Sequence, residues 1–360
     1  MLNVTLMYAL LMAGGSGTRL WPVSRKSSPK QLLKLVDNKT LLENTFDRLS
    51  KGFLNNKIFI ATTKQHAAAV AKQLPKVPKA NFSIEPMLKD RGPAIALAAL
   101  LIYHRDPEAC FVTAWADHYI DNEKSYFATL KIADIFLKKH PEYFLTIGVK
   151  PTYPHTGLGY IGQGKILTPP IREVINYKEK PDLKTAEKFF KSDNYLWNTG
   201  YFVCRADTLL KLYQKHQPKI YKVLMKIKPF IGTNKQQVAI NKFYPLMPHA
   251  DIEKGLVEKL NKVAVVPAAF NWADIGSWKI IKEVLSEDYE NLTKGNVSLH
   301  NTNKSLIYNY ENKLVAVVGL DDLIVVNTKD ALLIAPKNKS EEIKQLVKKL
   351  QKDKNLKKYL

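Results

Sequence analysis

From Leu11 to Lys30 the chain reads LMAGGSGTRLWPVSRKSSPK, a stretch that combines Gly14, Gly15 and Gly17 with basic residues. The apolar residues before it predict a first core strand over residues 5–12, so the glycines stand at the end of a strand. Glycine lets backbone N–H groups approach phosphate oxygens closely, and the cations of Arg19 and Lys30 neutralise their charge. No Gly-Lys-Ser/Thr follows, which excludes a Walker A loop. We therefore expect a triphosphate site after the first strand.

Short apolar segments alternate with helical patterns through the first 150 residues. Strands are expected at 5–12, 57–62, 81–84, 110–115 and 143–148, and helices at about 40–52, 64–73, 93–105 and 123–140. This alternation predicts an α/β fold with a mostly parallel sheet and helices on both faces. Ligands of such sheets bind beyond the carboxyl ends of the strands, where the candidate motifs fall.

After residue 150 the composition and the predicted secondary structure change. Residues 150–205 are rich in Gly, Pro, Tyr and β-type segments, and helical patterns follow at 206–216 and 236–247. From about residue 293, strands of five or six residues are separated by Asn, Asp, Gly and Lys, which is typical of a small stacked β module. A helical pattern, SEEIKQLVKKLQ, follows these strands. We expect one large domain over 1–290 and a β module over 291–360.

Composition limits the classes of protein. With 360 residues, 46% of them hydrophobic and 24% charged, the chain is a typical globular protein. Cys110 and Cys204 form no CxxC motif and lie in apolar runs, so we expect reduced, buried thiols. No apolar stretch has the roughly 18 to 20 residues of a membrane span, and the apolar N-terminus lacks the basic start of a signal peptide. A cytoplasmic protein with no membrane partner is expected.

The formal net charge of +22 and the pI of about 9.6 indicate attraction to anions. Scattered lysines on a solvated surface account for most of this charge. The basic and aromatic residues do not interleave as they do in RNA-binding proteins, so no nucleic-acid partner is expected.

Three further patterns carry chemistry. Asp117 follows an apolar strand and Asp274 lies in an aromatic turn, so their carboxylates can hold Mg²⁺, although either aspartate can also be a loop cap. Glu179 and Lys180 pair a carboxylate that accepts from sugar hydroxyls with an ammonium that meets a phosphate, although such pairs are common on surfaces. Glu85 can accept from the adjacent N1–H and N2–H₂ donors of guanine, and adenine lacks that pattern.

The motif GGSGTRLWP followed by SPKQLL resembles the signature of the sugar-nucleotide pyrophosphorylases, and its Trp21 resembles the mannose-1-phosphate guanylyltransferase branch. Further similar motifs extend the resemblance over nearly the whole chain: Glu85-Pro86, Trp115-Ala-Asp117-His118, Pro151 to Gly162, Glu179-Lys180-Pro181, Leu196 to Gly200, Trp272 to Trp278 and GLDDLIVVNTKDALLI.

The resemblance implies a Rossmann-like nucleotidyltransferase domain, a left-handed β-helix-like module used for homodimer formation, and synthesis of GDP-mannose and pyrophosphate from GTP and mannose 1-phosphate with Mg²⁺. The catalytic residues it implies are Arg19, Lys30, Asp117 and Asp274, of which the two aspartates are the metal ligands. The nucleotide would contact Ala13, Gly14, Gly15, Gly17, Thr18, Arg19, Glu85, Gly92, Pro93 and Asp117. The sugar phosphate would contact Gly157, Tyr160, Glu179, Lys180, Asn198 and Asp274.

Two segments depart from the family pattern. The run Lys89-Asp90-Arg91-Gly92 stands where the family usually has Arg-Asn-Thr-Ala, and Leu158 replaces a tyrosine. The sequence leaves open another sugar 1-phosphate or NTP, and more remotely a non-catalytic regulatory or nucleic-acid-binding relative. A GxGxxG match from Gly157 to Gly162 does not indicate a dehydrogenase, because prolines and strand-like alternation follow it where a helix is needed. Trp197, Phe270 and Trp272 are expected mainly to pack in the core.

Overall fold

The computed structural model describes residues 7–15, 17–25 and 27–360, which form two compact units. The first unit contains the described residues up to Ala13 together with Thr45–Trp115 and Ile120–Trp272. The second contains the described residues of Gly14–Asn44 together with Ala116–Tyr119 and Ala273–Leu360. Most of the Gly-rich stretch therefore packs in the same unit as the C-terminal strands.

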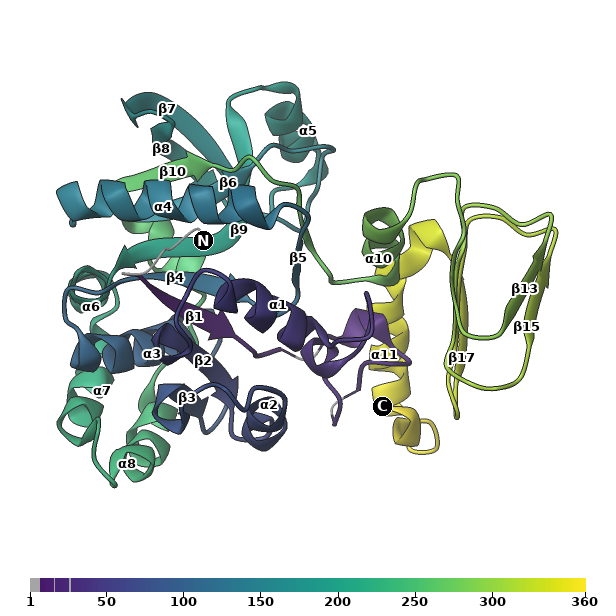
Figure 1. The fold of residues 1–360 in the computed structure, drawn as a ribbon, viewed down its shortest axis with the longest axis horizontal. Coiled ribbons are helices and arrows are strands. Elements are labelled where there is room, and N and C mark those ends of the chain that lie inside the picture. Colours follow the sequence, from purple (N-terminus) through teal and green to yellow (C-terminus); the bar gives the residue numbers. More distant parts are fainter. Residues whose placement is uncertain (1–6, 16, 26) are drawn as a thin grey trace. The chain divides into compact units, whose positions relative to one another are not determined.

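A nine-stranded sheet is the centre of the first unit (Figure 1). Its order is β3-β2-β1-β4-β9-β6-β10-β8-β7. The strands are β1 (Tyr8–Met12), β2 (Ile58–Thr63), β3 (Phe82–Glu85), β4 (Cys110–Trp115), β6 (Phe144–Val149), β7 (Tyr160–Thr168), β8 (Ile171–Lys178), β9 (Tyr195–Arg205) and β10 (Val263–Pro267). Only β9 and β8 run against the other seven, because β9 is antiparallel to both β4 and β6, and β8 is antiparallel to β10 and β7. The expectation of a mostly parallel sheet is confirmed.

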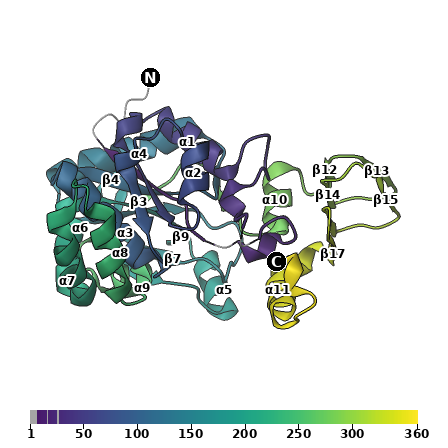
Figure 2. The ribbon, with the colours of Figure 1, turned by 90° about the horizontal axis from the view of Figure 1, so that it is seen from below.

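Helices cover both faces of this sheet. Helix α4 lies on one face, and α3, α6 and α7 pack together on the other (Figures 1 and 2). The buried stretch of α3 is rich in alanine, which lets the helix approach the sheet and its neighbours closely. The helices are α1 (Leu41–Ser50), α2 (Ala67–Gln73), α3 (Arg91–Arg105), α4 (Glu123–Lys139), α5 (Leu183–Lys191), α6 (Ala206–His216), α7 (Pro218–Ile227), α8 (Gln236–Phe243) and α9 (Ile252–Gly255).

The strands and helices expected in the first 150 residues are present to within a few residues, although residues 5–6 of the first expected strand lie outside the described residues. The helix expected over 236–247 ends at Phe243, and a 3-10 turn, Tyr244–Leu246, follows it. Pro245 explains the break, since a proline inside a helix lacks the N–H donor and clashes with the preceding turn.

Stacked strands dominate the C-terminal part of the second unit. Strands β12 (Leu292–Lys294), β14 (Leu306–Asn309) and β16 (Leu323–Asn327) pair in parallel, and so do β13 (Val297–His300) and β15 (Val315–Val318). Strand β17 (Leu332–Pro336) closes the larger sheet antiparallel to β16. Successive parallel rungs from one winding chain are typical of a β-helix, so the expected module is present.

The second unit has its own core, which joins the N-terminal loop to the stacked strands. The indole N–H of Trp278, at the start of α10 (Trp278–Leu285), donates to the carbonyl of Trp21 at 3.0 Å, and the Tyr308 hydroxyl donates to the Leu35 carbonyl at 3.1 Å. Helix α11 (Ile343–Lys352) buries Ile343, Val347 and Leu350 in the same core. Short strands β5 (His118–Ile120) and β11 (Trp272–Asp274) pair with each other where the chain passes from one unit to the other.

Both cysteines are free and buried, as expected. Burial raises the pKa of the Cys110 thiol to about 12, so it stays protonated at neutral pH. Among the described residues, no helix is long and apolar enough to cross a membrane.

Candidate active site

The Gly-rich loop makes room for Lys30. Gly15 and Gly17 have positive φ angles of 112° and 56°, which favour glycine. A Cβ on Gly17 would lie 2.7 Å from the Cβ of Lys30, so a larger residue there would displace the lysine. Thr18 begins a 3-10 turn, Thr18–Leu20, directly after Gly17. The placement of Gly14 leaves open space around its Cα, and Ala13 is fully buried in the first unit.

Lys30 brings the two predicted metal ligands together. Its side chain is nearly buried, and its Nζ pairs with the carboxylate of Asp117 and with Oδ1 of Asp274 at 3.3 Å. The same Nζ donates to the carbonyl of Ile275 at 3.2 Å, and the N–H of Ile275 donates to the Asp117 carbonyl at 2.9 Å. These bonds hold the segments around 117 and 275 side by side.

Lys30 and Asp274 each shift the pKa of the other toward its charged form. Burial alone would lower the pKa of Lys30, but the carboxylates of Asp117 and Asp274 outweigh it and raise that pKa. Burial opposes ionisation of Asp274, but Lys30, His118 and Arg19 lower its pKa to about 2. Both the ammonium and the Asp274 carboxylate are therefore charged at neutral pH.

A divalent cation has a candidate position among these side chains. Asp117, His118 and Asp274 each offer one ligand atom, and these atoms lie within 4.8 Å of one another. Two carboxylates supply the hard oxygen ligands that a divalent cation prefers, so the donor set fits such a metal. His118 was missed in the sequence as a ligand, although it stands in the quoted Trp-Ala-Asp-His motif.

Arg19 completes the predicted catalytic group. A Cβ on Gly276 would lie 3.1 Å from its NH2 and 3.6 Å from Oδ1 of Asp274, so this glycine leaves space for the guanidinium beside the aspartate. The NH1 of Arg19 pairs with Oε2 of Glu341 at 2.8 Å. All four residues expected to be catalytic thus meet within the second unit.

Five of the six residues expected at the sugar phosphate lie in the first unit, and the sixth, Asp274, lies in the second. Tyr177, which sequence reasoning missed, links two of them: the Asn198 amide donates to its hydroxyl at 2.5 Å, and this hydroxyl donates to Oε2 of Glu179 at 3.5 Å. Gly159 is needed beside them, because a Cβ there would lie 2.6 Å from that carboxylate oxygen. A tyrosine in a β-strand gives no local signal of such a role.

Lys180 and Glu179 form the pair that the sequence suggested. The Nζ of Lys180 donates to Oε1 of Glu179 at 2.7 Å. The lysine has a φ of 46°, which is uncommon for a residue with a side chain, and its side chain is half exposed while that of Glu179 is buried. A buried carboxylate beside an accessible ammonium matches the chemistry expected of a sugar-phosphate site.

Three residues expected at the sugar phosphate form hydrogen bonds with other residues of the protein. The Tyr160 hydroxyl is buried and accepts from the His155 N–H at 2.8 Å, and the Gly157 N–H donates to the His155 ring at 2.8 Å. The Oδ1 of Asn198 accepts from the Thr146 hydroxyl at 2.8 Å. These residues shape the segment before β7 and the strand β9, and their contacts with a sugar phosphate stay predictions.

Glu85 lies at the carboxyl end of β3 and is 4% exposed. The hydroxyl of Tyr244 donates to its Oε2, a contact that the sequence did not indicate. Burial raises the pKa of Glu85 to about 7, and the bond from Tyr244 partly opposes this rise. A carboxyl group that titrates near neutral pH is common in functional sites.

Gly92 and Pro93 lie in the first turn of α3, close to this glutamate in sequence. The Gly92 N–H donates to the Ala250 carbonyl at 2.9 Å, and its carbonyl accepts from the Tyr213 hydroxyl at 2.7 Å. Pro93 is buried in the first turn of the helix. Their expected nucleotide contacts stay predictions. Trp197 and Phe270 are buried, as expected for core residues, and Trp272 is partly exposed.

A family model described as "Nucleotidyl transferase" matches residues 8–291. The chain belongs to the nucleotidyl transferase family. A second model, "MannoseP isomerase/GMP-like beta-helix domain", matches residues 295–350 of this nucleotidyl transferase. It is therefore an enzyme with a nucleotidyltransferase domain and a β-helix-like module.

Curated relatives narrow the family. The chain is 33% identical to a mannose-1-phosphate guanylyltransferase of Escherichia coli over 95% of this chain and 75% of the relative. It is 35% identical to one of Salmonella montevideo over 95% and 73%. The resemblance to the mannose-1-phosphate guanylyltransferases seen in the sequence is thus confirmed.

Solved structures share the fold. A structure described as mannose-1-phosphate geranyltransferase from Thermus thermophilus matches with a TM-score of 0.86 and 28% identity, over 96% of this chain and 99% of that one. A UDP-glucose pyrophosphorylase with bound UDP-glucose matches with a TM-score of 0.52 and 19% identity, over 78% and 97%, which supports the fold alone.

Proposed function

We propose that this enzyme transfers GMP from GTP to α-D-mannose 1-phosphate and releases GDP-mannose and pyrophosphate. The observation that carries the proposal is the convergence of Lys30, Asp117 and Asp274 behind a Gly-rich turn. The names of the relatives at 33–35% identity support the choice of substrates. We assign the catalytic role to residues 1–290 and a packing role to 291–360.

In this reaction an oxygen of the sugar phosphate attacks the α-phosphorus of GTP, and the bond to the bridging oxygen of the β-phosphate breaks. The protein forms no covalent bond, so its task is to align the reactants and to stabilise charge. Backbone N–H groups of Gly14, Gly15 and Gly17 would face the triphosphate, and Thr18 would support them. The cations of Arg19 and Lys30 would balance the negative charge that moves toward pyrophosphate.

We propose Mg²⁺ as the metal of the Asp117–His118–Asp274 cluster, held chiefly by the two carboxylates. When bound, it supplies charge neutralisation and polarises a phosphate oxygen. The low pKa of Asp274 keeps that ligand ionised across the physiological pH range.

The acceptor is assigned to the group around Glu179. Its carboxylate accepts from sugar hydroxyls, and the half-exposed Lys180 meets the sugar's phosphate. The Tyr177 hydroxyl, on β8, donates to that carboxylate, and the Asn198 amide, on β9, donates to this hydroxyl. Gly157 and Tyr160 shape the adjoining loop through His155.

Two further assignments concern the whole molecule. We propose a homodimer formed through the C-terminal module, because β15 and β17 expose Val318, Leu332 and Ile334, each more than half accessible. We also propose a cytoplasmic location, since two free buried thiols fit a reducing compartment.

The test is a matrix of nucleotides against sugars. GTP, ATP, UTP and dTTP are each paired with mannose, glucose, galactose and heptose 1-phosphates, and pyrophosphate release is measured. We expect GTP with mannose 1-phosphate to give the highest kcat/KM. A tenfold or greater preference for another pair would refute the proposed substrates. A reaction without any sugar 1-phosphate is the control, since pyrophosphate released in it does not come from transfer to the acceptor.

A further inference from the structure

Arg91 occupies a position where the family run Arg-Asn-Thr-Ala has threonine, and it is bound by three carboxylates. Its NH1 donates to Oε1 of Glu253 at 2.7 Å, and its NH2 pairs with Asp251. Glu253 is 1% exposed, so this ion pair is desolvated. Two carboxylates thus bind separate nitrogens of the guanidinium. This fixes its orientation and balances its charge, because its planar donors match carboxylate geometry.

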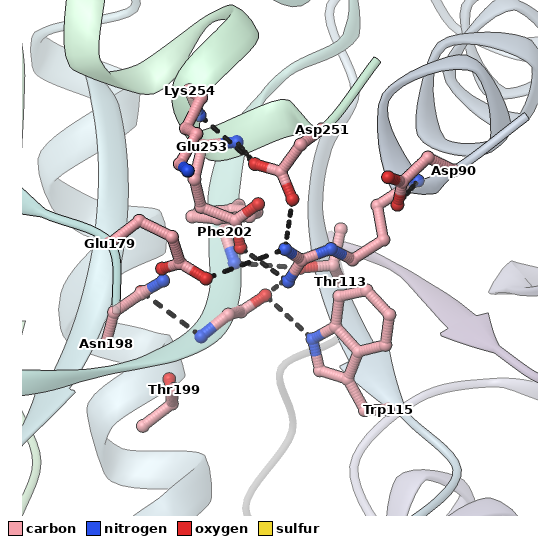
Figure 3. Close-up of polar contacts among 12 residues, drawn as sticks. Asp90, Thr113, Trp115, Glu179, Asn198, Thr199, Phe202, Asp251, Glu253 and Lys254 are labelled. Carbon is pink, nitrogen blue, oxygen red and sulfur yellow. Dashed lines mark hydrogen bonds and ion pairs between the residues drawn. The ribbon is translucent and has the colours of Figure 1, made fainter. Parts of the chain in front are cut away.

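The third carboxylate is Glu179. Its Oε1 lies 3.9 Å from NH2 of Arg91 and accepts from Lys180 at 2.7 Å. Two cations therefore face one oxygen of this carboxylate, and the other oxygen faces the Tyr177 hydroxyl and Gly159. Figure 3 shows Glu179, Asp251 and Glu253 pointing toward one another.

The surroundings leave Arg91 little freedom. Its guanidinium lies over the Trp115 ring, 5.8 Å from the ring centre, and the indole N–H of Trp115 donates to the Gly200 carbonyl at 2.9 Å. Asp90 has a φ of 74°, and its side chain accepts from the Arg91 N–H at 2.8 Å. A positive φ at a residue with a side chain is unfavourable, and it persists where its surroundings fix it.

The loop before α3 is also fastened to the segment that bears the acidic partners. The Gly92 N–H donates to the Ala250 carbonyl at 2.9 Å, and the Ala250 N–H donates to the Lys89 carbonyl at 3.2 Å. A side chain at Gly92 would meet that carbonyl at 2.6 Å, so glycine lets the two segments approach. Arg91 thus stands between the loop that follows Glu85 and the carboxylate of Glu179.

We propose that Arg91 is a positioning residue for Glu179, and that in this chain it sets the affinity for the acceptor sugar phosphate. The proposal rests on the proposed function, which assigns Glu179 to sugar hydroxyls. Without Arg91, the Glu179, Asp251 and Glu253 carboxylates would lose the cation that they share. Their mutual repulsion would then move the Glu179 carboxylate from its place beside Lys180 and Tyr177, and its pattern of acceptors for the sugar would be lost.

The experiment compares Arg91→Ala and Arg91→Lys with the unaltered enzyme. KM for the acceptor, KM for GTP and kcat are measured separately, using the sugar 1-phosphate that the unaltered enzyme prefers. Loss of one charge-assisted contact changes an equilibrium by about 10- to 100-fold. We expect Arg91→Ala to raise the acceptor KM by at least about tenfold and to change the GTP KM by less than about twofold. The acceptor KM of Arg91→Lys should lie between those of the unaltered enzyme and Arg91→Ala, since lysine keeps the charge and lacks the planar guanidinium.

Arg205→Ala is the matched control. It removes another arginine of the first unit that pairs with two carboxylates, Asp207 at 2.9 Å and Glu108 at 3.0 Å, and it should leave both KM values unchanged. An unchanged acceptor KM in folded Arg91→Lys, or equal rises in both KM values, would overturn the proposal. Arg91→Lys decides the question if the alanine variant does not fold. An enzyme that prefers another sugar would refute the proposed function and still allow this test.

Discussion

Glu85 gives the sharpest prediction about nucleotide choice. It is buried at the end of β3 with the Tyr244 hydroxyl on one carboxylate oxygen. Guanine offers the N1–H and N2–H₂ donors side by side, and inosine lacks the N2 amine. If Glu85 reads guanine, Glu85→Gln keeps the shape, removes one acceptor and the charge, and adds a donor facing a donor.

The size of the effect follows from the contacts. A hydrogen bond to a charged group contributes about 1.5–3 kcal/mol, and 1.4 kcal/mol corresponds to a factor of ten. We expect Glu85→Gln to lower kcat/KM for GTP by about 10- to 100-fold and to narrow the ratio of GTP to ITP. The unaltered enzyme should prefer GTP to ATP by about a thousandfold or more, because adenine leaves the carboxylate facing a lone pair.

The raised pKa gives the same prediction a pH dependence. Burial raises the pKa of Glu85 to about 7, so the carboxylate form that we expect to accept from guanine is lost as pH falls through that value. The ratio of kcat/KM for GTP to that for ITP should therefore rise with pH through about 7. Tyr244→Phe removes a bond that lowers this pKa, so its inflection should lie at higher pH.

The assay is kcat/KM for GTP, ITP and ATP from pH 5.5 to 9 with each variant. Glu142→Gln serves as the control, because Glu142 is exposed and pairs with Lys262 at 3.2 Å. A GTP-to-ITP ratio that is equal in Glu85→Gln and the unaltered enzyme would show that Glu85 does not read the base.

Three further predictions concern the rest of the molecule. Asp117→Asn and Asp274→Asn should each lower kcat at least about a hundredfold with the fold intact, measured by steady-state kinetics and circular dichroism, since each removes the charge of a proposed metal ligand; near-normal turnover of a folded variant would show that its residue is not a metal ligand. Lys180→Ala should raise the KM for mannose 1-phosphate, whereas Lys30→Ala should damage the GTP parameters; the reverse pattern would contradict the division of roles. Deletion from residue 293 onward should lower the melting temperature and leave substrate preference unchanged, because it uncovers Trp278; an unchanged melting temperature together with a changed preference for the acceptor sugar would contradict this.

Local sequence patterns were sufficient to predict the framework. The alternation of short apolar runs and helical periodicity located β1, β2, β3, β4 and β6, because the apolar residues of each segment show which of its faces is buried. They did not predict that β9 lies between β4 and β6 and runs against both. Strand order depends on long-range pairing, and residues 195–205 carry no local mark of their neighbours.

Residue type and the family-like spacing were sufficient to identify the candidate motifs, which are the glycines before Lys30, both aspartates, Glu85 and the Glu179-Lys180 pair.

Which of these side chains contact one another could be read only from the folded chain. It places Lys30 against Asp117 and Asp274, and it gives Glu85 and Glu179 their partners Tyr244, Tyr177 and Arg91. The physical reason is that a charge or hydrogen bond acts over a few ångströms of space, so its partners depend on how distant segments pack together and not on their order along the chain.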